Sequence, residues 1–144
     1  MVVEEASRSA WESFAEDHPQ ATACHLWGWR EVIDRTFGHQ GHYLLARRDG
    51  RVCGALPLIL MRSILFGRFL SSVPYLNYGG CLATEPEVEA ALLAEAVKIA
   101  RNTRSRSIEL RHVEKRSCPE EVKSHKVTML LSLTGEEKSQ WEAF

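Results

Sequence analysis

The chain has 144 residues, of which 44% are hydrophobic and 26% are charged, and its formal net charge is −1. This length and composition are typical of one globular domain with its own core. The small net charge excludes a global field that would attract nucleic acid or an anionic membrane. No apolar run is long enough to cross a bilayer, and the first nine residues do not resemble a signal peptide. We therefore expect a cytoplasmic protein.

The cysteines give no sign of a metal site. Cys24, Cys53, Cys81 and Cys118 are scattered, none forms a Cys-x-x-Cys pair, and none has a histidine at zinc-finger spacing. Scattered single cysteines are typical of proteins from a reducing compartment. We therefore expect neither a metal ion nor a cofactor.

The N-terminal part of the sequence predicts two helices. Ser9 and Glu12 have the spacing of a capping box, which predicts a helix over residues 9–17. A second apolar stripe predicts a helix over residues 26–37, with Gly38 as its C-terminal cap.

The second helix carries two tryptophans that cannot share one face, because they lie two residues apart. Trp29 belongs to the apolar stripe with Leu26, Ile33 and Phe37, so we expect it in the core. Trp27 is then the exposed tryptophan, and it either lines a binding groove or is simply solvated.

Alternating apolar residues predict three strands after these helices, over residues 42–48, 51–61 and 69–73. Asp49-Gly50 is a hairpin signal between the first two strands. Pro57 predicts an edge position or a bulge in the second strand.

A third helix is predicted to begin at Thr84, because Thr84 and Glu87 have capping-box spacing. Its expected buried face is Val88, Ala91, Leu92, Ala96 and Ile99. Two further strands are predicted over residues 107–113 and 127–133. We expect residues 1–133 to form one mixed α/β (α+β) domain with a mainly antiparallel sheet flanked by helices.

A last helix is predicted to begin at Thr134, where Thr134 and Glu137 again have capping-box spacing. Residues 134–144 contain no C-terminal cap for this helix. We therefore expect the chain to be part of a longer protein.

The segment Val73-Pro74-Tyr75-Leu76-Asn77-Tyr78-Gly79-Gly80 is the strongest candidate for a functional site. Its glycines allow unusual backbone conformations, and its tyrosines and asparagine offer stacking surfaces and directional hydrogen bonds. Such a loop after a strand suits a ligand. The alternative is a wide turn whose tyrosines fill the edge of the core.

Several motifs resemble, in their order, the N-terminal half of Fem-type acyltransferases. They are most similar to the FemAB-related proteins associated with bacterial PEP-CTERM and exopolysaccharide systems. The most specific is Phe66-Gly67-Arg68 followed by residues 72–80. The others are His18-Pro19-Gln20-Ala21-Thr22 with Trp29 and Phe37-Gly38-His39, residues 44–58, Ile108-Glu109-Leu110-Arg111, and Lys126-Val127-Thr128. The resemblance covers the whole chain but only about half of a family member.

The resemblance implies a GNAT-like fold and a role as the N-terminal, acceptor-binding half of an acyl or aminoacyl transferase. Members of known activity move an amino acid from aminoacyl-tRNA to a cell-wall precursor peptide. The implied partners are an acyl donor and a cell-envelope acceptor, held jointly with a C-terminal half. The chain alone is then expected to be inactive, and its catalytic residues stay unassigned.

The resemblance also places acceptor-binding residues in the loop. Tyr75, Asn77 and Tyr78 occupy the positions where this family has them. The full set of substrate-binding candidates is Tyr75, Asn77, Tyr78, Gly79, Gly80 and Trp27.

Two other functions stay open at this point, namely a non-catalytic module that binds a glycan or peptide and a GNAT-type N-acetyltransferase. Acetyl-CoA enzymes of the GNAT class need a basic, glycine-rich loop at a helix N-terminus. Here Gly79-Gly80 lack the Arg-x-x-Gly-x-Gly pattern, and Glu85 and Glu87 would repel a phosphate. The sequence therefore departs from CoA-binding members.

Three further groups of polar residues have two interpretations each. Arg101, Arg104 and Arg106 are either a contact for a polyanion or a solvated helix end. Glu109 and Arg111 form either the polar floor of a cleft or a solvated sheet face. His39 and His42 have no evident catalytic partner, so we expect them to pack in loops.

Overall fold

The computed structural model describes residues 1–63, 65, 67–113 and 135–142. The chain divides into two units, residues 1–114 and 115–144. In the described part of the second unit, helix α4 spans Glu137–Glu142. The predicted strand over residues 127–133 and the predicted helix start at Thr134 lie outside the described residues.

The first unit is built on one six-stranded sheet in the order β1-β2-β3-β4-β6, with β5 paired to β3. Its described pairs are antiparallel except the parallel pair of β4 and β6. The predicted mixed α/β architecture with a mainly antiparallel sheet is confirmed. The strands are β1 (Val2–Glu5), β2 (Gln40–Arg48), β3 (Arg51–Ser63), β4 (Gly67–Ser71), β5 (Leu82–Ala83) and β6 (Ile108–Glu109).

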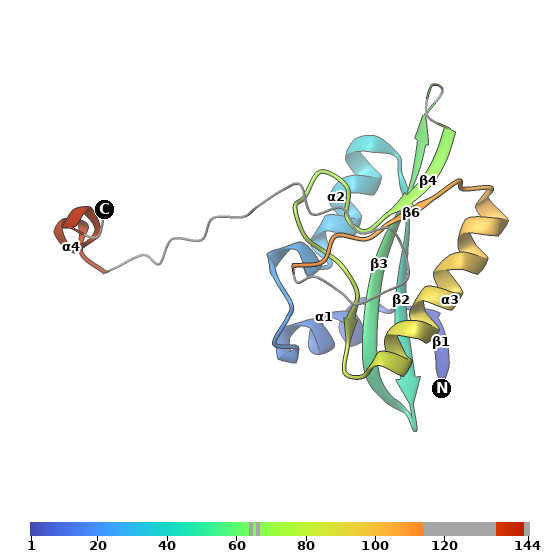
Figure 1. Ribbon diagram of the computed structural model, residues 1–144, viewed down its shortest axis with the longest axis horizontal. Coiled ribbons are helices and arrows are strands. Elements are labelled where there is room, and N and C mark those ends of the chain that lie inside the picture. Colours follow the sequence, from blue (N-terminus) through green and yellow to red (C-terminus); the bar gives the residue numbers. More distant parts are fainter. Residues whose placement is uncertain (64, 66, 114–134, 143–144) are drawn as a thin grey trace. The chain divides into compact units, whose positions relative to one another are not determined.

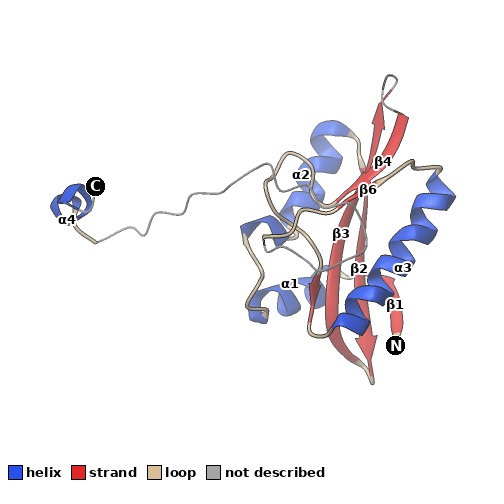
Figure 2. Cartoon of the chain, in the orientation of Figure 1, coloured by secondary structure: helices blue, strands red, loops and turns tan. Residues whose placement is uncertain are grey.

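Helices cover both faces of this sheet (Figures 1 and 2). One face carries α1 (Arg8–Asp17), the short 3-10 helix η1 (Ala23–His25) and α2 (Gly28–Phe37), and the other carries α3 (Pro86–Thr103). Two cores result. The α3 core includes Leu44, Leu56, Leu58, Leu60, Leu70, Val88 and Leu92, and the α1/α2 core includes Trp11, Trp27, Ile33, Tyr43, Leu45, Ile59 and Val73.

Strand β3 supplies both cores because successive side chains of a strand point to opposite faces. Leu56, Leu58 and Leu60 face α3, as the alternating pattern predicts, and Ala55 and Ile59 face α1 and α2.

The hairpin between β2 and β3 has the turn that its sequence predicts. Asp49 and Gly50 both have positive φ, 51° and 81°, which suits the right-handed twist of the strands. Pro57 does not form a bulge, but on the β4 and β5 side of β3 it has no strand partner, as the predicted edge position requires. It pairs with Tyr43 inside β3, and the register irregularity lies at Ala46/Arg47.

The position of Pro57 is explained by the other side of β3. There, β4 pairs from Ile59 onward and β5 pairs with Gly54 and Ala55, so Pro57 lies between the two ladders. A residue without an N–H donor is tolerated where no ladder bond is required.

Both predicted capping boxes in the described residues are wrong. Helix α1 begins at Arg8 after Ser7, and Glu12 forms an ion pair with Arg8 at 2.9 Å instead of capping. Helix α3 begins at Pro86, a residue suited to a first helical position. The Thr84 hydroxyl donates to the Cys53 carbonyl at 3.1 Å, so it is not available as a cap.

The buried face predicted for α3 is largely confirmed. Val88, Leu92 and Ala96 are fully buried, whereas Ala91 and Ile99 are half-buried. The structure also contains two strands that the sequence analysis misses, β1 and β5, and β6 is shorter than the predicted strand over residues 107–113.

The prediction that Trp27 is the exposed tryptophan is wrong. Trp27 is 9% exposed and its ring packs edge-on against Trp11 and Tyr43. It precedes helix α2, so the helical spacing does not govern its direction. Trp29 is only half-buried, and its indole N–H donates to the Ala23 carbonyl. Phe37, expected in the core, is 49% exposed.

No helix within the described residues is both long enough and apolar enough to cross a bilayer. The same residues contain no cluster of three histidine, cysteine or acidic side chains that would hold a metal ion.

The packing of α3 on the sheet depends on Gly54. A Cβ atom at this position would lie 2.5 Å from Val88 Cγ1 and 2.9 Å from Leu92 Cδ1. We predict that Gly54→Ala lowers the free energy of unfolding by about 1–3 kcal/mol, because the added atom forces α3 away from β3. Urea denaturation measures this change.

Gly28→Ala is the matched control, because nothing lies within 4 Å of the added atom there. It should change stability by less than about 1 kcal/mol. Equal effects of the two substitutions would contradict close α3 packing.

Candidate functional site

The candidate site is the loop of residues 72–81, which leaves the sheet after β4 and leads to β5. Strand β4 runs parallel to β6, so the two strands end at the same edge of the sheet. Ser72 continues this pairing by donating its N–H to the Glu109 carbonyl at 2.9 Å. The loop therefore begins at the carboxyl ends of two parallel strands.

The loop backbone is held in conformations that L-residues rarely adopt. Val73, Tyr75 and Gly79 have φ values of 40°, 71° and 125°. A positive φ is a genuine outlier for a β-branched residue such as Val73. Conformations of this kind persist only when surrounding contacts impose them.

Arg111 supplies several of these contacts. Its backbone N–H donates to the Ser72 hydroxyl at 2.9 Å, and its guanidinium donates to the Leu76 carbonyl. A further N–H bonds the Glu109 carboxylate at 2.9 Å. Glu109 is exposed and Arg111 is half-buried. The pair therefore matches neither of the two interpretations from the sequence, the polar floor of a cleft and a solvated sheet face. It connects β6 to the loop.

His25 holds the other end of the loop. Its Nδ1 lies 3.1 Å from the Thr22 N–H and must accept from it. The proton is therefore on Nε2, which donates to the Gly80 carbonyl at 3.1 Å. Burial lowers the pKa of His25 below its ordinary value, which keeps the ring neutral and leaves Nδ1 able to accept from the Thr22 N–H.

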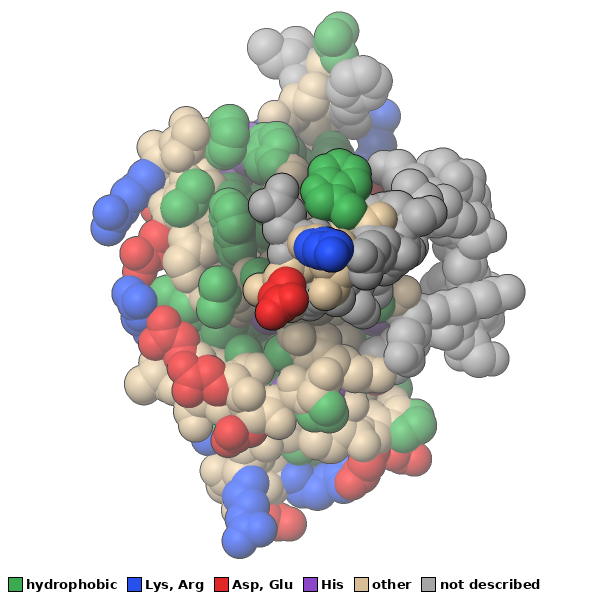
Figure 3. Space-filling model, turned by 90° about the vertical axis from the view of Figure 1, so that its left-hand side faces the viewer, with side chains coloured by type: hydrophobic (Ala, Val, Ile, Leu, Met, Phe, Trp, Pro, Cys, Tyr) green, Lys and Arg blue, Asp and Glu red, His purple; other side chains and the backbone are tan. Residues whose placement is uncertain are grey.

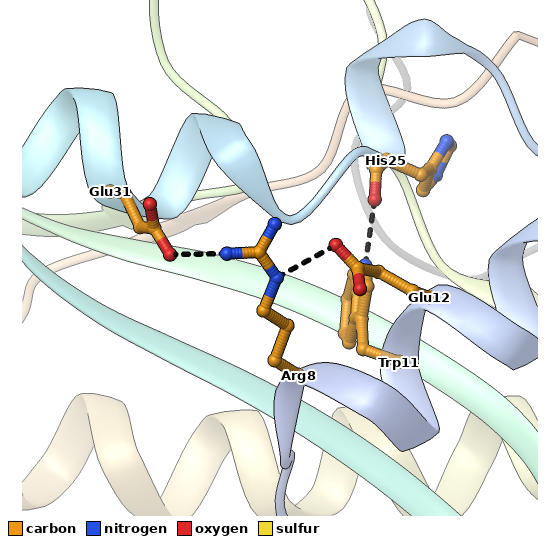
Figure 4. Close-up of polar contacts among 5 residues, drawn as sticks. All are labelled: Arg8, Trp11, Glu12, His25 and Glu31. Atoms are coloured by element: carbon orange, nitrogen blue, oxygen red, sulfur yellow. Dashed lines mark hydrogen bonds and ion pairs between the residues drawn. The ribbon is translucent and has the colours of Figure 1, made fainter.

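The backbone of His25 is fixed in turn by α1. Trp11 is fully buried and its indole N–H donates to the His25 carbonyl at 2.6 Å (Figure 4). In the same view, Arg8 bridges Glu12 of α1 and Glu31 of α2. That bridge is solvent-exposed and contributes little to stability.

The two loop glycines are buried and pack against the protein's own side chains. A Cβ atom on Gly79 would lie 2.7 Å from Val73 Cγ2, and one on Gly80 would lie 2.8 Å from His112 Nδ1. The lack of a side chain at both positions thus serves the internal packing of the loop.

The side chains that the loop presents to solvent are those of Tyr75 and Asn77, with Tyr78 half-exposed. Tyr75 is 57% exposed, and its ring stacks on Phe37 with centroids 4.5 Å apart. His39 also stacks on Tyr75, and its Nε2 lies 3.2 Å from the tyrosine hydroxyl. We call Phe37, His39 and Tyr75 the aromatic stack.

Two further hydrophobic side chains of residues 26–37 are exposed, Leu26 and Val32. Figure 3 shows hydrophobic side chains gathered on the upper part of the face that carries α2. Exposed hydrophobic groups that cluster are typical of interaction sites.

The other sequence candidates lie apart from the exposed residues of the loop. Trp27 is buried in the α1/α2 core. Arg101 lies in the last turn of α3, Arg104 caps it, and Arg106 follows it, joined to β4 by a backbone bond to Arg68.

Three buried polar atoms lack a hydrogen-bond partner within the described residues, His42 Nε2, the Tyr43 hydroxyl and Ser71 Oγ. Ser71 is the last residue of β4 and pairs with Ile59, which faces the α1/α2 core. Its hydroxyl is thus buried at the base of the loop.

The N-terminus of α3 is acidic. Glu85 caps the helix, and Glu87 and Glu89 lie in its first turn. Arg48 pairs with Glu85 at 2.7 Å, and Glu87 and Glu89 add two further carboxylates near the positive end of the helix dipole. These charges disfavour binding of a phosphate there.

Comparison with solved structures identifies the fold. FemX matches with a TM-score of 0.54 at 23% identity, covering 73% of this chain and 25% of its own. A ribosomal-protein-alanine N-acetyltransferase from Brucella melitensis biovar Abortus matches with a TM-score of 0.55 at 14% identity, covering 92% and 100%. A GNAT family acetyltransferase from Staphylococcus aureus matches at 0.53 and 10%, covering 89% and 98%.

No protein-family model and no curated sequence matches the chain. The chain has a GNAT-like fold, as the sequence resemblance implies. It spans about a quarter of the length of FemX and nearly all of the two acetyltransferases.

The sequence predicts this loop as a binding site, but it does not predict most of the contacts that hold the loop in place. His25 and Phe37 carried no signal of their own, since a lone histidine and a stripe aromatic usually belong to the core. Arg111 belongs to an alternating strand pattern, which does not predict its contacts with the loop.

The neutral state of His25 gives a pH dependence. Burial also lowers the pKa of His42, so both rings are harder to protonate in the folded state than in the unfolded state. The unfolded state then binds more protons once the pH falls below about 6.5. We predict full stability above this pH and a progressive loss as the pH falls through the lower folded-state pKa values.

Urea denaturation across this pH range measures the effect. His25→Gln should cost about 1–2 kcal/mol at neutral pH through the lost bond to Gly80, and it should flatten the pH profile. His42→Gln is the control, because it removes a half-buried histidine of β2 without touching the loop. A pH profile that His25→Gln leaves unchanged would argue against a neutral His25.

Proposed function

We propose that this chain is the acceptor-binding part of a Fem-type acyl or aminoacyl transferase that acts on a cell-envelope precursor. The GNAT-like fold, shared with FemX and acetyltransferases, supports acyl transfer to an amine. The ordered motifs around residues 66–80 support the Fem type and the PEP-CTERM and exopolysaccharide group. In this proposal the donor, such as an aminoacyl-tRNA, is held jointly with a further domain.

The observation that carries the proposal is a rigid loop with exposed recognition groups. Arg111 and His25 fix the backbone of residues 72–81, while Tyr75 and Asn77 face solvent. A fixed backbone lowers the entropy cost of binding. Tyr75, supported from behind by Phe37, offers a stacking plane to a sugar or peptide, and Asn77 offers both a donor and an acceptor to an amide.

Acyl transfer to an amine needs no protein nucleophile. Catalysis can consist of positioning the amine against an activated ester and stabilising the oxyanion that forms. We assign the positioning of the acceptor to the loop and place the groups that act on the ester in the further domain.

A stand-alone N-acetyltransferase is the second candidate, because this chain covers nearly the whole length of two acetyltransferases. The acidic N-terminus of α3 argues against it. A diphosphate placed there, as in acetyl-CoA enzymes of this class, would meet Glu87 and Glu89.

We predict that calorimetric titration of the chain with coenzyme A shows no binding, because those carboxylates repel the diphosphate. A micromolar dissociation constant would reject this prediction and favour the acetyltransferase. The same titration with Glu87→Gln/Glu89→Gln distinguishes two causes of absent binding. Binding by this variant would indicate charge repulsion in the original chain, and no binding would indicate that the chain lacks a coenzyme A site.

We predict that Asn77→Ala and Tyr78→Phe, placed in the natural full-length protein, raise the KM for the acceptor. The loss of one hydrogen bond should cost roughly 1–2 kcal/mol of binding, a rise of about 5- to 30-fold in KM. Asn77 is exposed, so its substitution should leave the melting temperature nearly unchanged. Steady-state kinetics and thermal denaturation measure the two effects.

Asn102→Ala is the matched control, since Asn102 is an exposed asparagine at the far end of α3. If the loop variants lose stability and keep the acceptor KM, the loop is a packing element. Retained ligand binding with no transfer by the full-length protein would favour the non-catalytic binding module.

A further inference from the structure

His39 and Tyr75 form a hydrogen-bonded pair within the aromatic stack. The Nε2 atom of His39 lies 3.2 Å from the Tyr75 hydroxyl, and the planes of the two rings differ by only 11°. No partner for His39 is evident in the sequence, because Tyr75 lies 36 residues further along the chain. The structure therefore gives this histidine a titratable partner on the candidate loop.

The pair is accessible from solvent. Tyr75 is 57% exposed and His39 is half-buried, whereas His25 is buried and the Nε2 atom of His42 is also buried. Because Tyr75 is the more exposed member of the pair, a ligand on the loop contacts the tyrosine first. A proton released by that ligand can reach His39 through the Tyr75 hydroxyl.

The Tyr75 hydroxyl is held in position without any ligand. Phe37 stacks on the tyrosine ring with centroids 4.5 Å apart, and His39 contacts its hydroxyl. The adjoining backbone is fixed as well, because the Arg111 guanidinium donates to the Leu76 carbonyl. A polar group that is already in place needs no reorganisation at the moment of reaction.

The backbone of Tyr75 indicates that its side chain does more than fill space. Its φ is 71°, a conformation that strains a tyrosine and that glycine adopts readily. Since the ring is more than half exposed, burial of the ring does not explain why a tyrosine is kept there. Strained residues cluster at active sites and ligand clamps, so the strain favours a functional role for this side chain.

Acyl transfer to an amine requires a proton acceptor. Only a neutral amine has the lone pair that attacks an ester, and its nitrogen must lose a proton after the attack. Free amino groups are mostly protonated at neutral pH, because their ordinary pKa is about 8 at a peptide N-terminus and about 10.4 on lysine. Histidine is the side chain whose ordinary pKa best suits a base at that pH.

We propose that Tyr75 and His39 form a proton relay that deprotonates the acceptor amine, an inference that rests on the acyl transfer proposed above. The amine nitrogen bonds to the acyl carbon and its N–H bond breaks. That proton passes to the Tyr75 oxygen, while the Tyr75 O–H bond breaks and its proton bonds to Nε2 of His39. The ester C–O bond breaks and the leaving alkoxide takes a proton from water. The imidazolium then gives its proton to the resulting hydroxide.

The relay requires one tautomer of His39. Its Nε2 must accept from the Tyr75 hydroxyl, so the neutral ring carries its proton on Nδ1. Nuclear magnetic resonance that correlates the ring protons with the ring nitrogens tests this on the 144-residue chain, without any substrate. A neutral ring with its proton on Nε2 would overturn the relay.

Steady-state kinetics of the natural full-length protein tests the proton transfer, with total aminoacyl-tRNA as donor and a cell-wall precursor peptide as acceptor. His39→Gln and Tyr75→Phe should each lower kcat by about 100-fold, with a smaller change in the acceptor KM. The kcat of the unsubstituted protein should decline at acid pH as the imidazole is protonated, and His39→Gln should lack this decline. Tyr75→Phe keeps the ring that stacks on Phe37, so it removes only the hydroxyl.

His18→Gln is the matched control. The His18 ring also packs against a phenylalanine, Phe14, with centroids 5.3 Å apart, but it caps helix α1 and lies outside the loop. This substitution should leave both kcat and its decline at acid pH unchanged. Thermal denaturation should show that every variant is folded.

The kinetic outcomes separate the relay from the proposed function. No transfer by the unsubstituted protein would contradict the proposed function and the relay with it. Transfer at the full rate by His39→Gln, with the decline at acid pH retained, would overturn the relay alone. A loss in His39→Gln that Tyr75→Phe does not share would also overturn it, because the proton would then reach the histidine directly.

Discussion

Burial of β3 on both faces is the constraint on which the first unit depends. Residues 54–60 are buried, and they alternate between the α3 core and the α1/α2 core. Every layer therefore packs on one strand. The closest approach is at Gly54, where α3 and β5 occupy the space of a side chain. Burial at this density fixes the relative positions of α2, β4 and α3.

The candidate site follows from a change of partner along β3. Strand β4 pairs with one end of β3, and β5 pairs farther along the same side of β3. Residues 72–81 therefore leave the sheet and return to it, and Val73 enters the α1/α2 core on the way. The strained backbone is thus imposed by the core, and Arg111 and His25 complete it. Because these contacts hold its backbone, the loop can expose Tyr75 and Asn77 without losing its conformation.

The sequence predicted correctly those structural features that depend on residues close together in the chain. The Asp49-Gly50 turn, the Gly38 cap and the alternation of β3 all appear as expected, because each depends on residues adjacent in the chain. The capping boxes failed, because Glu12 and Thr84 found partners outside their own helix ends. Strands β1 and β5 are short and paired only with distant residues. The loop was predicted as a site, whereas its contacts with His25 and Arg111 span dozens of residues and leave no local pattern.

The central claim is that the loop of residues 72–81 is a preformed surface for an acceptor. It is tested most directly by nuclear magnetic resonance of the isotopically labelled chain during titration with a soluble cell-wall precursor peptide that carries its amino sugar. The account predicts amide shifts centred on Tyr75, Asn77 and Tyr78, with smaller shifts at Phe37 and His39 of the aromatic stack. Shifts centred on another surface, or a silent loop at millimolar peptide, would contradict it.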